Sequence, residues 1–240
     1  MEEIRQKDID WLLNLNEEFV RPELPSKPKI KSRFRFSTLL VGAALVITLA
    51  ILPFFLLVRT SVYLEQIMQL NPWLSLLGGI LSVIFLLGFY VLLLIRKLEN
   101  RRLIMRYAMR GVSVMVAGFC LYGLFYISSL NAKDDNIREV YRSLHPVMRV
   151  AVSTLTLADK DLVITDISRT QEDYRRMGLP VNESSLHFRQ ASGFVHAIDL
   201  RTIGQPEWRN KLLEFTFKAL GIHTIRHVGT ADHLHVYLQV

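Results

Sequence analysis

Cysteine is almost absent from this chain, because Cys120 is the only one among 240 residues. A single thiol cannot form an intramolecular disulfide, so the fold is not a disulfide scaffold. Residues 131–240 contain no cysteine at all, which excludes a thiol nucleophile and cysteine-ligated zinc from that part of the chain. The sequence also lacks internal repeats and low-complexity tracts.

Charge is absent from three long apolar stretches, residues 37–58, 73–95 and 111–130, which are 20 to 23 residues long. About 20 helical residues span the hydrocarbon core of a bilayer, and soluble helices are rarely apolar all round for so long. The sequence therefore predicts three transmembrane helices. The first stretch follows a charged segment, which favours an uncleaved anchor over a signal peptide.

Basic residues flank these stretches unevenly. Five lie before the first stretch (Lys27, Lys29, Lys31, Arg33 and Arg35), and six lie between the second and third (Arg96, Lys97, Arg101, Arg102, Arg106 and Arg110). Only Arg59 lies between the first and second. The positive-inside rule places both basic segments in the cytoplasm. This pattern accounts for most of the net charge of +7, and no motif indicates a nucleic-acid partner.

Three parts follow from this topology: a cytoplasmic N-terminal segment (1–36), a three-helix membrane anchor (37–130) and a domain across the membrane (131–240). In a Gram-negative cell the last would be periplasmic and the anchor would lie in the inner membrane. Residues 8–20 have the pattern of a short amphipathic helix, either interfacial or a docking peptide.

The C-terminal domain has the pattern of an α+β fold with a small, mainly antiparallel sheet. We expect helices over 134–159, 170–178 and 206–221 and strands over 161–168, 193–201, 223–229 and 233–240. The helix over 206–221 is bounded by Pro206 and Gly221, which commonly begin and end helices.

Six of the seven histidines lie between residues 187 and 235, and several occur beside carboxylates. Their motifs are "SLH" at 185–187, "HAIDL" at 196–200 and "DHLH" at 232–235. His233 and His235 would point to the same face of a strand because side chains alternate. Two imidazoles and one carboxylate supply three zinc ligands and leave a fourth position for water, as in hydrolytic zinc sites.

These motifs, in this order after Arg169, resemble a family of zinc peptidases. It includes the D-Ala-D-Ala carboxypeptidases of the VanY and VanX type and the L-alanyl-D-glutamate endopeptidases of phage endolysins, together the LAS superfamily. The family pattern runs from a strand, an Arg and a short helix to Ser-x-His, Gly-x-Ala-x-Asp, a further helix, and a carboxylate three residues before a His. The resemblance covers residues 145–240 and excludes the membrane part.

The resemblance implies a site that binds Zn²⁺ through His187, Asp199 and His235. Asp232 would be the general base, and His233 would lie beside the metal or the substrate. Arg169 would stabilise charge on the scissile carbonyl or bind a substrate carboxylate. Ser185 would support the loop of the first ligand or contact the substrate.

One spacing departs from the family pattern. Eleven residues, 188–198, separate His187 from Asp199, whereas the family usually has six. His196 is the alternative first ligand, although it lies three residues from Asp199 and the two would face opposite sides of a regular strand.

The expected function is therefore a membrane-anchored zinc metallopeptidase that hydrolyses peptidoglycan stem peptides for local cell-wall remodelling. Assembly of an envelope-spanning secretion system, such as type VI, is one setting for that activity. The alternatives are a non-catalytic zinc-bearing binding module and a structural membrane subunit of an envelope complex. The sequence leaves open which bond is cut and whether the enzyme is an endopeptidase or a carboxypeptidase.

Overall fold

The computed structural model describes residues 7, 10, 11, 36–176, 178, 180–229 and 232–239. Most of the predicted helix over 8–20 and the basic residues at 27–35 lie outside the described residues. The chain divides into two compact units, Met1–Val46 and Ile47–Val240. Of the first unit, little more than the beginning of the first long helix is described. The second unit contains the rest of the described chain.

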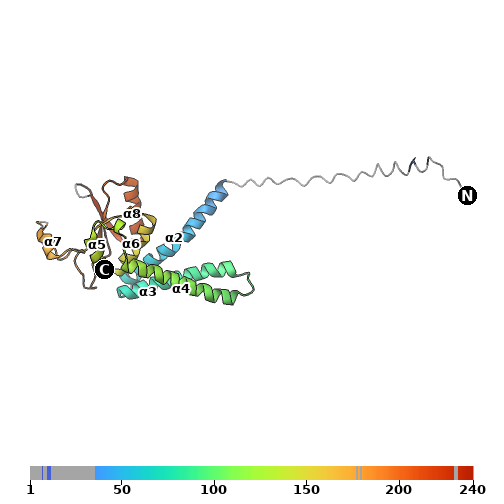
Figure 1. The fold of residues 1–240 in the computed structure, drawn as a ribbon, viewed down its shortest axis with the longest axis horizontal. Helices are drawn as coiled ribbons and strands as arrows, with labels where there is room; N and C mark the ends of the chain where they lie inside the picture. Colours follow the sequence, from blue (N-terminus) through green and yellow to red (C-terminus); the bar gives the residue numbers. More distant parts are fainter. Residues whose placement is uncertain are drawn as a thin grey trace. The chain divides into compact units, whose positions relative to one another are not determined.

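Three helices are long and apolar enough to cross a membrane: α2 (Phe36–Gln66), α3 (Pro72–Ile95) and α4 (Arg101–Phe125). They confirm three long apolar helices at the predicted stretches, and α3 and α4 run side by side as a hairpin (Figure 1). Helix α4 begins ten residues earlier than the predicted span at 111, so four arginines expected in a loop lie on it. Arginine, leucine and methionine are good helix formers, and arginine can extend its charge toward the headgroups.

Helices α2 and α3 pack closely at Gly79. A Cβ atom added at Gly79 would lie 2.5 Å from the backbone carbonyl oxygen of Leu57 and would also overlap the Ser61 hydroxyl. That hydroxyl donates a hydrogen bond of 2.8 Å to the same carbonyl. Small residues let helix backbones approach within a membrane, so Gly79 and Ser61 set the contact between the two helices.

The chain after α4 forms an α+β domain, which confirms the predicted class. Its elements are η1 (Ser129–Asn131), α5 (Asp135–Val140), η2 (Tyr141–Ser143), α6 (Pro146–Ala158), β1 (Ile164–Asp166), α7 (Gln171–Arg176), β2 (Ala197–Arg201), α8 (Glu207–Leu220), β3 (His223–His227) and β4 (His233–Tyr237). The prediction of one helix over 134–159 is wrong. The chain is extended at His145 (ψ 134°), because a residue before proline disfavours the helical conformation.

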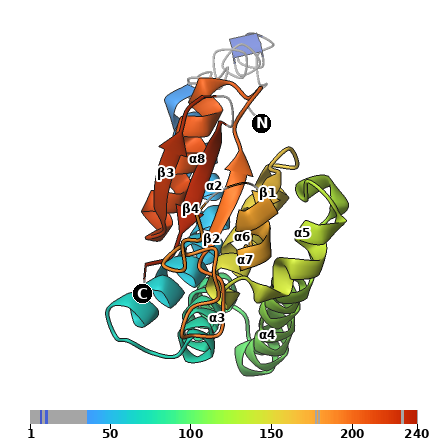
Figure 2. The ribbon, with the colours of Figure 1, turned by 90° about the vertical axis from the view of Figure 1, so that its left-hand side faces the viewer.

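The four strands form one antiparallel sheet in the order β1-β2-β4-β3, visible side by side in Figure 2. Asp199 on β2 pairs with His235 on β4. The adjacent positions Ile198, Leu200, Leu234 and Val236 are fully buried and belong to the hydrophobic core. Since side chains alternate along a strand, Asp199, His233 and His235 lie on the opposite face.

The domain packs directly against α2, α3 and α4. The carbonyl of Gly123, near the end of α4, accepts a hydrogen bond of 2.9 Å from the Tyr141 hydroxyl. The next carbonyl, that of Leu124, accepts one from the buried Arg149 guanidinium. Buried Glu65 of α2 lies 2.7 Å from buried His145. One hydrophobic core extends from α2, α3 and α4 into the sheet.

We expect Gly79→Ala to destabilise the protein, because the new methyl group meets a backbone oxygen that cannot move aside without separating the helices. Overpacking of this kind costs about 1–3 kcal/mol. The measurement is thermal unfolding of the full chain in detergent. The matched control is Gly118→Ala, where an added Cβ meets nothing within 4 Å. Equal midpoints for the two variants would contradict close packing at Gly79.

Candidate metal centre

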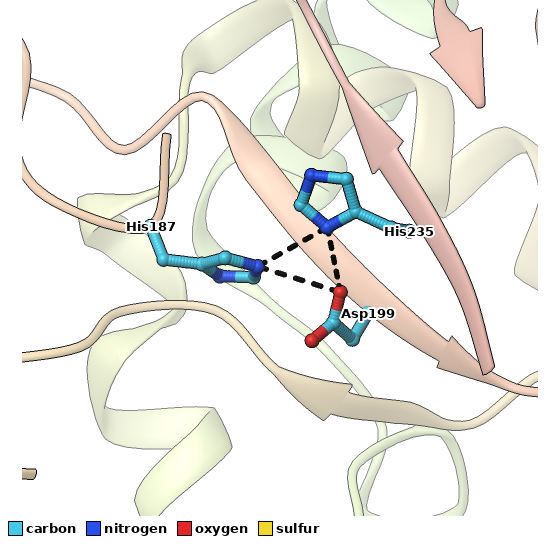
Figure 3. A group of neighbouring side chains, drawn as sticks. All are labelled: His187, Asp199 and His235. Atoms are coloured by element: carbon cyan, nitrogen blue, oxygen red, sulfur yellow. Dashed lines mark hydrogen bonds and ion pairs between the residues drawn. The ribbon is translucent and has the colours of Figure 1, made fainter. Parts of the chain in front are cut away.

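Three ligand-type side chains meet on the polar face of the sheet (Figure 3). His235 Nδ1 lies 2.8 Å from Asp199 Oδ1. His187 Nε2 lies 3.4 Å from the same oxygen and 3.3 Å from His235 Nδ1. Three segments supply them: strand β2, strand β4 and the loop that follows α7. Pairing of β2 with β4 brings Asp199 and His235 together, and the loop adds His187.

Asp199 is a buried carboxylate surrounded by donors. Burial raises its pKa, but hydrogen bonds from His187 and His235 outweigh that effect and hold the pKa well below its usual range. Its other oxygen, Oδ2, accepts a hydrogen bond of 3.0 Å from Arg169 Nη2. Arg169 also bonds the carboxylate of Asp166, three residues before it. Asp199 is therefore ionised at neutral pH, as a metal ligand must be.

The His187 ring is oriented by a hydrogen bond to a backbone carbonyl. Its Nδ1 lies 2.8 Å from the carbonyl oxygen of buried Ile167. That carbonyl can only accept, so Nδ1 carries a proton, and Nε2 faces Asp199 and His235. A metal-ligating histidine typically donates its second nitrogen in this way. The Ser185 hydroxyl accepts a hydrogen bond of 3.3 Å from the His187 backbone N–H, a contact within the ligand loop.

His196 occupies a different environment. Its Nε2 lies 2.6 Å from the Ser192 hydroxyl, and its ring packs edge to face against that of His145, with the ring centroids 4.7 Å apart. Burial and the neighbouring His145 lower its pKa to about 4. Among the described residues, the group of ligand atoms within 4.8 Å of one another contains His187 and not His196. The geometry therefore favours His187 over the alternative.

The residues between His187 and β2 form a compact turn. Gln190 N–H donates to the Phe194 carbonyl at 2.8 Å, and Gly193 N–H donates back to Gln190 at 2.9 Å. Gly193 has a φ of 82°, which favours glycine. Arg189 and Val195 pair across this turn. The turn accommodates the additional residues, so the long spacing between His187 and Asp199 does not separate them in space.

The donor set fits a zinc ion. Bonds of about 2.0–2.1 Å to nitrogen and oxygen in a tetrahedron place the ligand atoms about 3.3 Å apart. The three separations in this site are 2.8, 3.3 and 3.4 Å. These residues could hold a metal ion with little rearrangement, although the same donors also suit other divalent transition metals.

Asp232 and His233 precede the candidate ligand His235 by three and two residues, and they have different contacts. Both Asp232 oxygens accept hydrogen bonds from Arg226, at 2.7 and 2.9 Å, and Oδ1 accepts another from Thr202. Arg226 and then Thr202 lower the pKa of Asp232. His233 Nε2 lies 3.8 Å from Asp199 Oδ1, and its ring stacks on that of His227 at 4.8 Å.

Two adjoining cavities open beside the site. One of about 410 Å³ is lined by all three candidate ligands together with Arg169, Ser185, Ile225, His227 and His233. The other, of about 610 Å³, shares Arg169, Asp199 and His233 and extends along β1 toward α5. Sequence reasoning missed the contribution of β3, which supplies Ile225, His227 and Arg226. The available signal was the alternating pattern of "HTIRH" at 223–227. Paired with "HLHVY" at 233–237, it puts Ile225 opposite His235 and His227 opposite His233.

No family model, curated protein or solved structure matches this chain. The argument for its function therefore depends on the geometry of the site and on the motifs in the sequence.

We expect the full chain, purified in detergent, to bind about one zinc ion per molecule. Asp199→Asn and His235→Ala each remove a ligand and should weaken binding by at least about 100-fold, more than loss of an outer hydrogen-bond partner. His187→Ala should do the same. The measurement is metal content after dialysis against a zinc buffer.

His196→Gln is the control for this experiment, because His196 is buried nearby but lies outside the ligand group. It should retain zinc. Retention by His187→Ala together with loss in His196→Gln would reverse the assignment of the first ligand.

Proposed function

We propose that this protein is a membrane-anchored zinc metallopeptidase that hydrolyses peptidoglycan stem peptides outside the cytoplasmic membrane. The observation that carries the proposal is the buried group of His187, Asp199 and His235 beside two open cavities. The sequence motifs support it, since Ser-x-His, Ala-x-Asp and Asp-x-x-His occur in the order typical of zinc peptidases that act on cell-wall peptides.

The residues around the proposed metal site would have separate roles. Zinc bound by His187, Asp199 and His235 would supply Lewis-acid activation of water and of the scissile carbonyl. Arg169 directs its guanidinium at Asp199 Oδ2 and also lines both cavities. Its positive charge would stabilise the negative charge that develops on the scissile carbonyl oxygen when water attacks. Ser185, which lines the smaller cavity, would bind substrate or hold the ligand loop.

Proton transfer is assigned to Asp232, with His233 as its partner or replacement. The lowered pKa of Asp232 keeps it ionised at neutral pH, so it can accept a proton, but its bonds to Arg226 reduce its basicity. His233 lies closer to the ligand group, 3.8 Å from Asp199 Oδ1. Both side chains line the larger cavity, where a substrate peptide would reach them.

The location follows from the proposed topology. The C-terminal domain would lie in the periplasm of a Gram-negative cell, where peptidoglycan is the available substrate. Because the domain packs on the ends of α2, α3 and α4, it would act close to the membrane surface. Local cutting of this kind would suit assembly of an envelope-spanning secretion system, such as type VI.

A second candidate function is a zinc-bearing binding module without turnover. The observation that favours it is the double hydrogen bond from Arg226 to Asp232, which leaves the proposed base less available. The module would recognise the same peptides and would lack hydrolysis. The structural-subunit alternative would need neither zinc nor the cavities.

We expect Asp232→Asn to keep zinc and to lose activity on purified peptidoglycan by about 10²–10⁴-fold, because asparagine cannot accept the proton. His233→Gln should lose less. Release of soluble muropeptides by the full chain in detergent measures both. Asp161→Asn, at an exposed carboxylate away from the cavities, is the control and should remain fully active.

Two results would change this assignment. A larger loss in His233→Gln than in Asp232→Asn would move the base to His233. Zinc binding without muropeptide release by the unmodified chain would replace the enzyme with the binding module.

The topology has its own test. A reporter active only in the periplasm should be active when fused after Val240, and a reporter active only in the cytoplasm should be active when fused near Arg102. The reason is the concentration of Lys and Arg on the side of the α3–α4 connection. The reverse pattern would remove peptidoglycan as a substrate.

A further inference from the structure

The larger cavity beside the metal centre contains two cations that no carboxylate among the described residues pairs with. It has a volume of about 610 Å³ and extends from Asp199 and His233 to the chain before α5. Four basic side chains line it: Lys133, Arg169, Arg176 and Arg201. Their partners within the protein show which charges are available to a ligand.

Two of the four are paired. Arg169 bonds Asp166 and Asp199, and Arg176 Nη2 lies 3.0 Å from Asp173 Oδ1. Of the acidic residues in the cavity, Asp232 is bonded to Arg226, which lies outside the cavity lining. Asp134 accepts from the Ile137 backbone N–H at the start of α5.

The other two basic side chains have no such partner. Lys133 and Arg201 make no side-chain hydrogen bond or ion pair with any residue in the described part of the chain. Both are exposed. The cavity therefore presents two cations without an ionic partner among the described residues, and one carboxylate, Asp134, whose partner is a backbone N–H and not a cation.

The backbone holds both residues in place. Arg201 follows Asp199 by two residues on β2, so it lies on the same face of the sheet, and it pairs in register with His233. The Lys133 backbone N–H donates a hydrogen bond of 2.9 Å to the Ile164 carbonyl. A β-bridge between Ala132 and Ile164 attaches the same segment to β1. Neither position depends on a long unsupported loop.

We infer that Lys133 and Arg201 form a carboxylate-binding subsite that selects acidic peptides at the metal centre. This inference rests on the proposed function and specifies its substrate: a peptide that carries a free carboxylate away from the scissile bond. The planar guanidinium of Arg201 matches a carboxylate with two parallel hydrogen bonds, and Lys133 adds a second positive charge. Arg169 is already paired with Asp199 and Asp166, so the subsite is distinct from the group that serves the scissile carbonyl.

The test measures binding, so it does not require hydrolysis. The full chain carrying Asp232→Asn is loaded with zinc in detergent and titrated with a synthetic stem peptide that has free carboxylates. The same peptide with those carboxylates amidated is the comparison ligand. We expect the acidic peptide to bind about tenfold more tightly or better, which is the scale of one charge-assisted hydrogen bond.

Substitutions in the same background locate the subsite. Arg201→Gln and Lys133→Gln should each lower affinity for the acidic peptide by about tenfold and leave affinity for the amidated peptide unchanged. Arg175→Gln and Lys211→Gln, two exposed cations outside the cavity, are the matched controls and should change neither.

Equal affinity of the two peptides, or acidic-peptide binding that is unaffected by Arg201→Gln, would overturn the inference. The two proposals fail separately. Arg201-dependent binding of the acidic peptide without muropeptide release by the unmodified chain would retain the subsite and refute the enzyme. Muropeptide release without that dependence would retain the enzyme and refute the subsite.

Discussion

The buried carboxylate of Asp199 is the group on which the site depends. A charge removed from water is costly unless donors surround it, and here His187, His235 and Arg169 do so from three other segments of the chain. Those contacts connect strand β4, the loop after α7 and the segment after β1 to strand β2. The same contacts keep Asp199 ionised and turn two imidazoles toward one point, which is the arrangement that a divalent metal requires.

The second constraint is the junction between the three long apolar helices and the domain. The last carbonyls of a helix lack partners within it, and those of Gly123 and Leu124 are bonded by Tyr141 and Arg149 of the domain. Since the helices and the sheet share one hydrophobic core, the domain is not held on a flexible tether. A site on such a domain would act at a short, fixed distance from the bilayer, which suits a substrate that lies beside the membrane.

One face of the sheet forms the hydrophobic core, and the other carries the candidate site. One face buries Ile198, Leu200, Leu234 and Val236 in the hydrophobic core. The other presents the ligands, the histidines of β3 and β4, and Arg201 to the cavities. Because alternation places every second residue on the polar face, five-residue strands are enough to build both the core and the site.

The sequence by itself determined the features that depend on local composition. Twenty uncharged apolar residues are a membrane-length helix in any context, and the alternation of "HLHVY" already places His233 and His235 on one face. The residue before a proline disfavours the helical conformation, and the prediction of one helix over 134–159 missed this signal at Pro146. Tertiary structure decided the choice between His187 and His196, the pairing of Asp232 with Arg226, and the exposure of Lys133 and Arg201 in one cavity. These depend on strand register and on how one turn folds back, and neither is encoded in the spacing of residues along the chain.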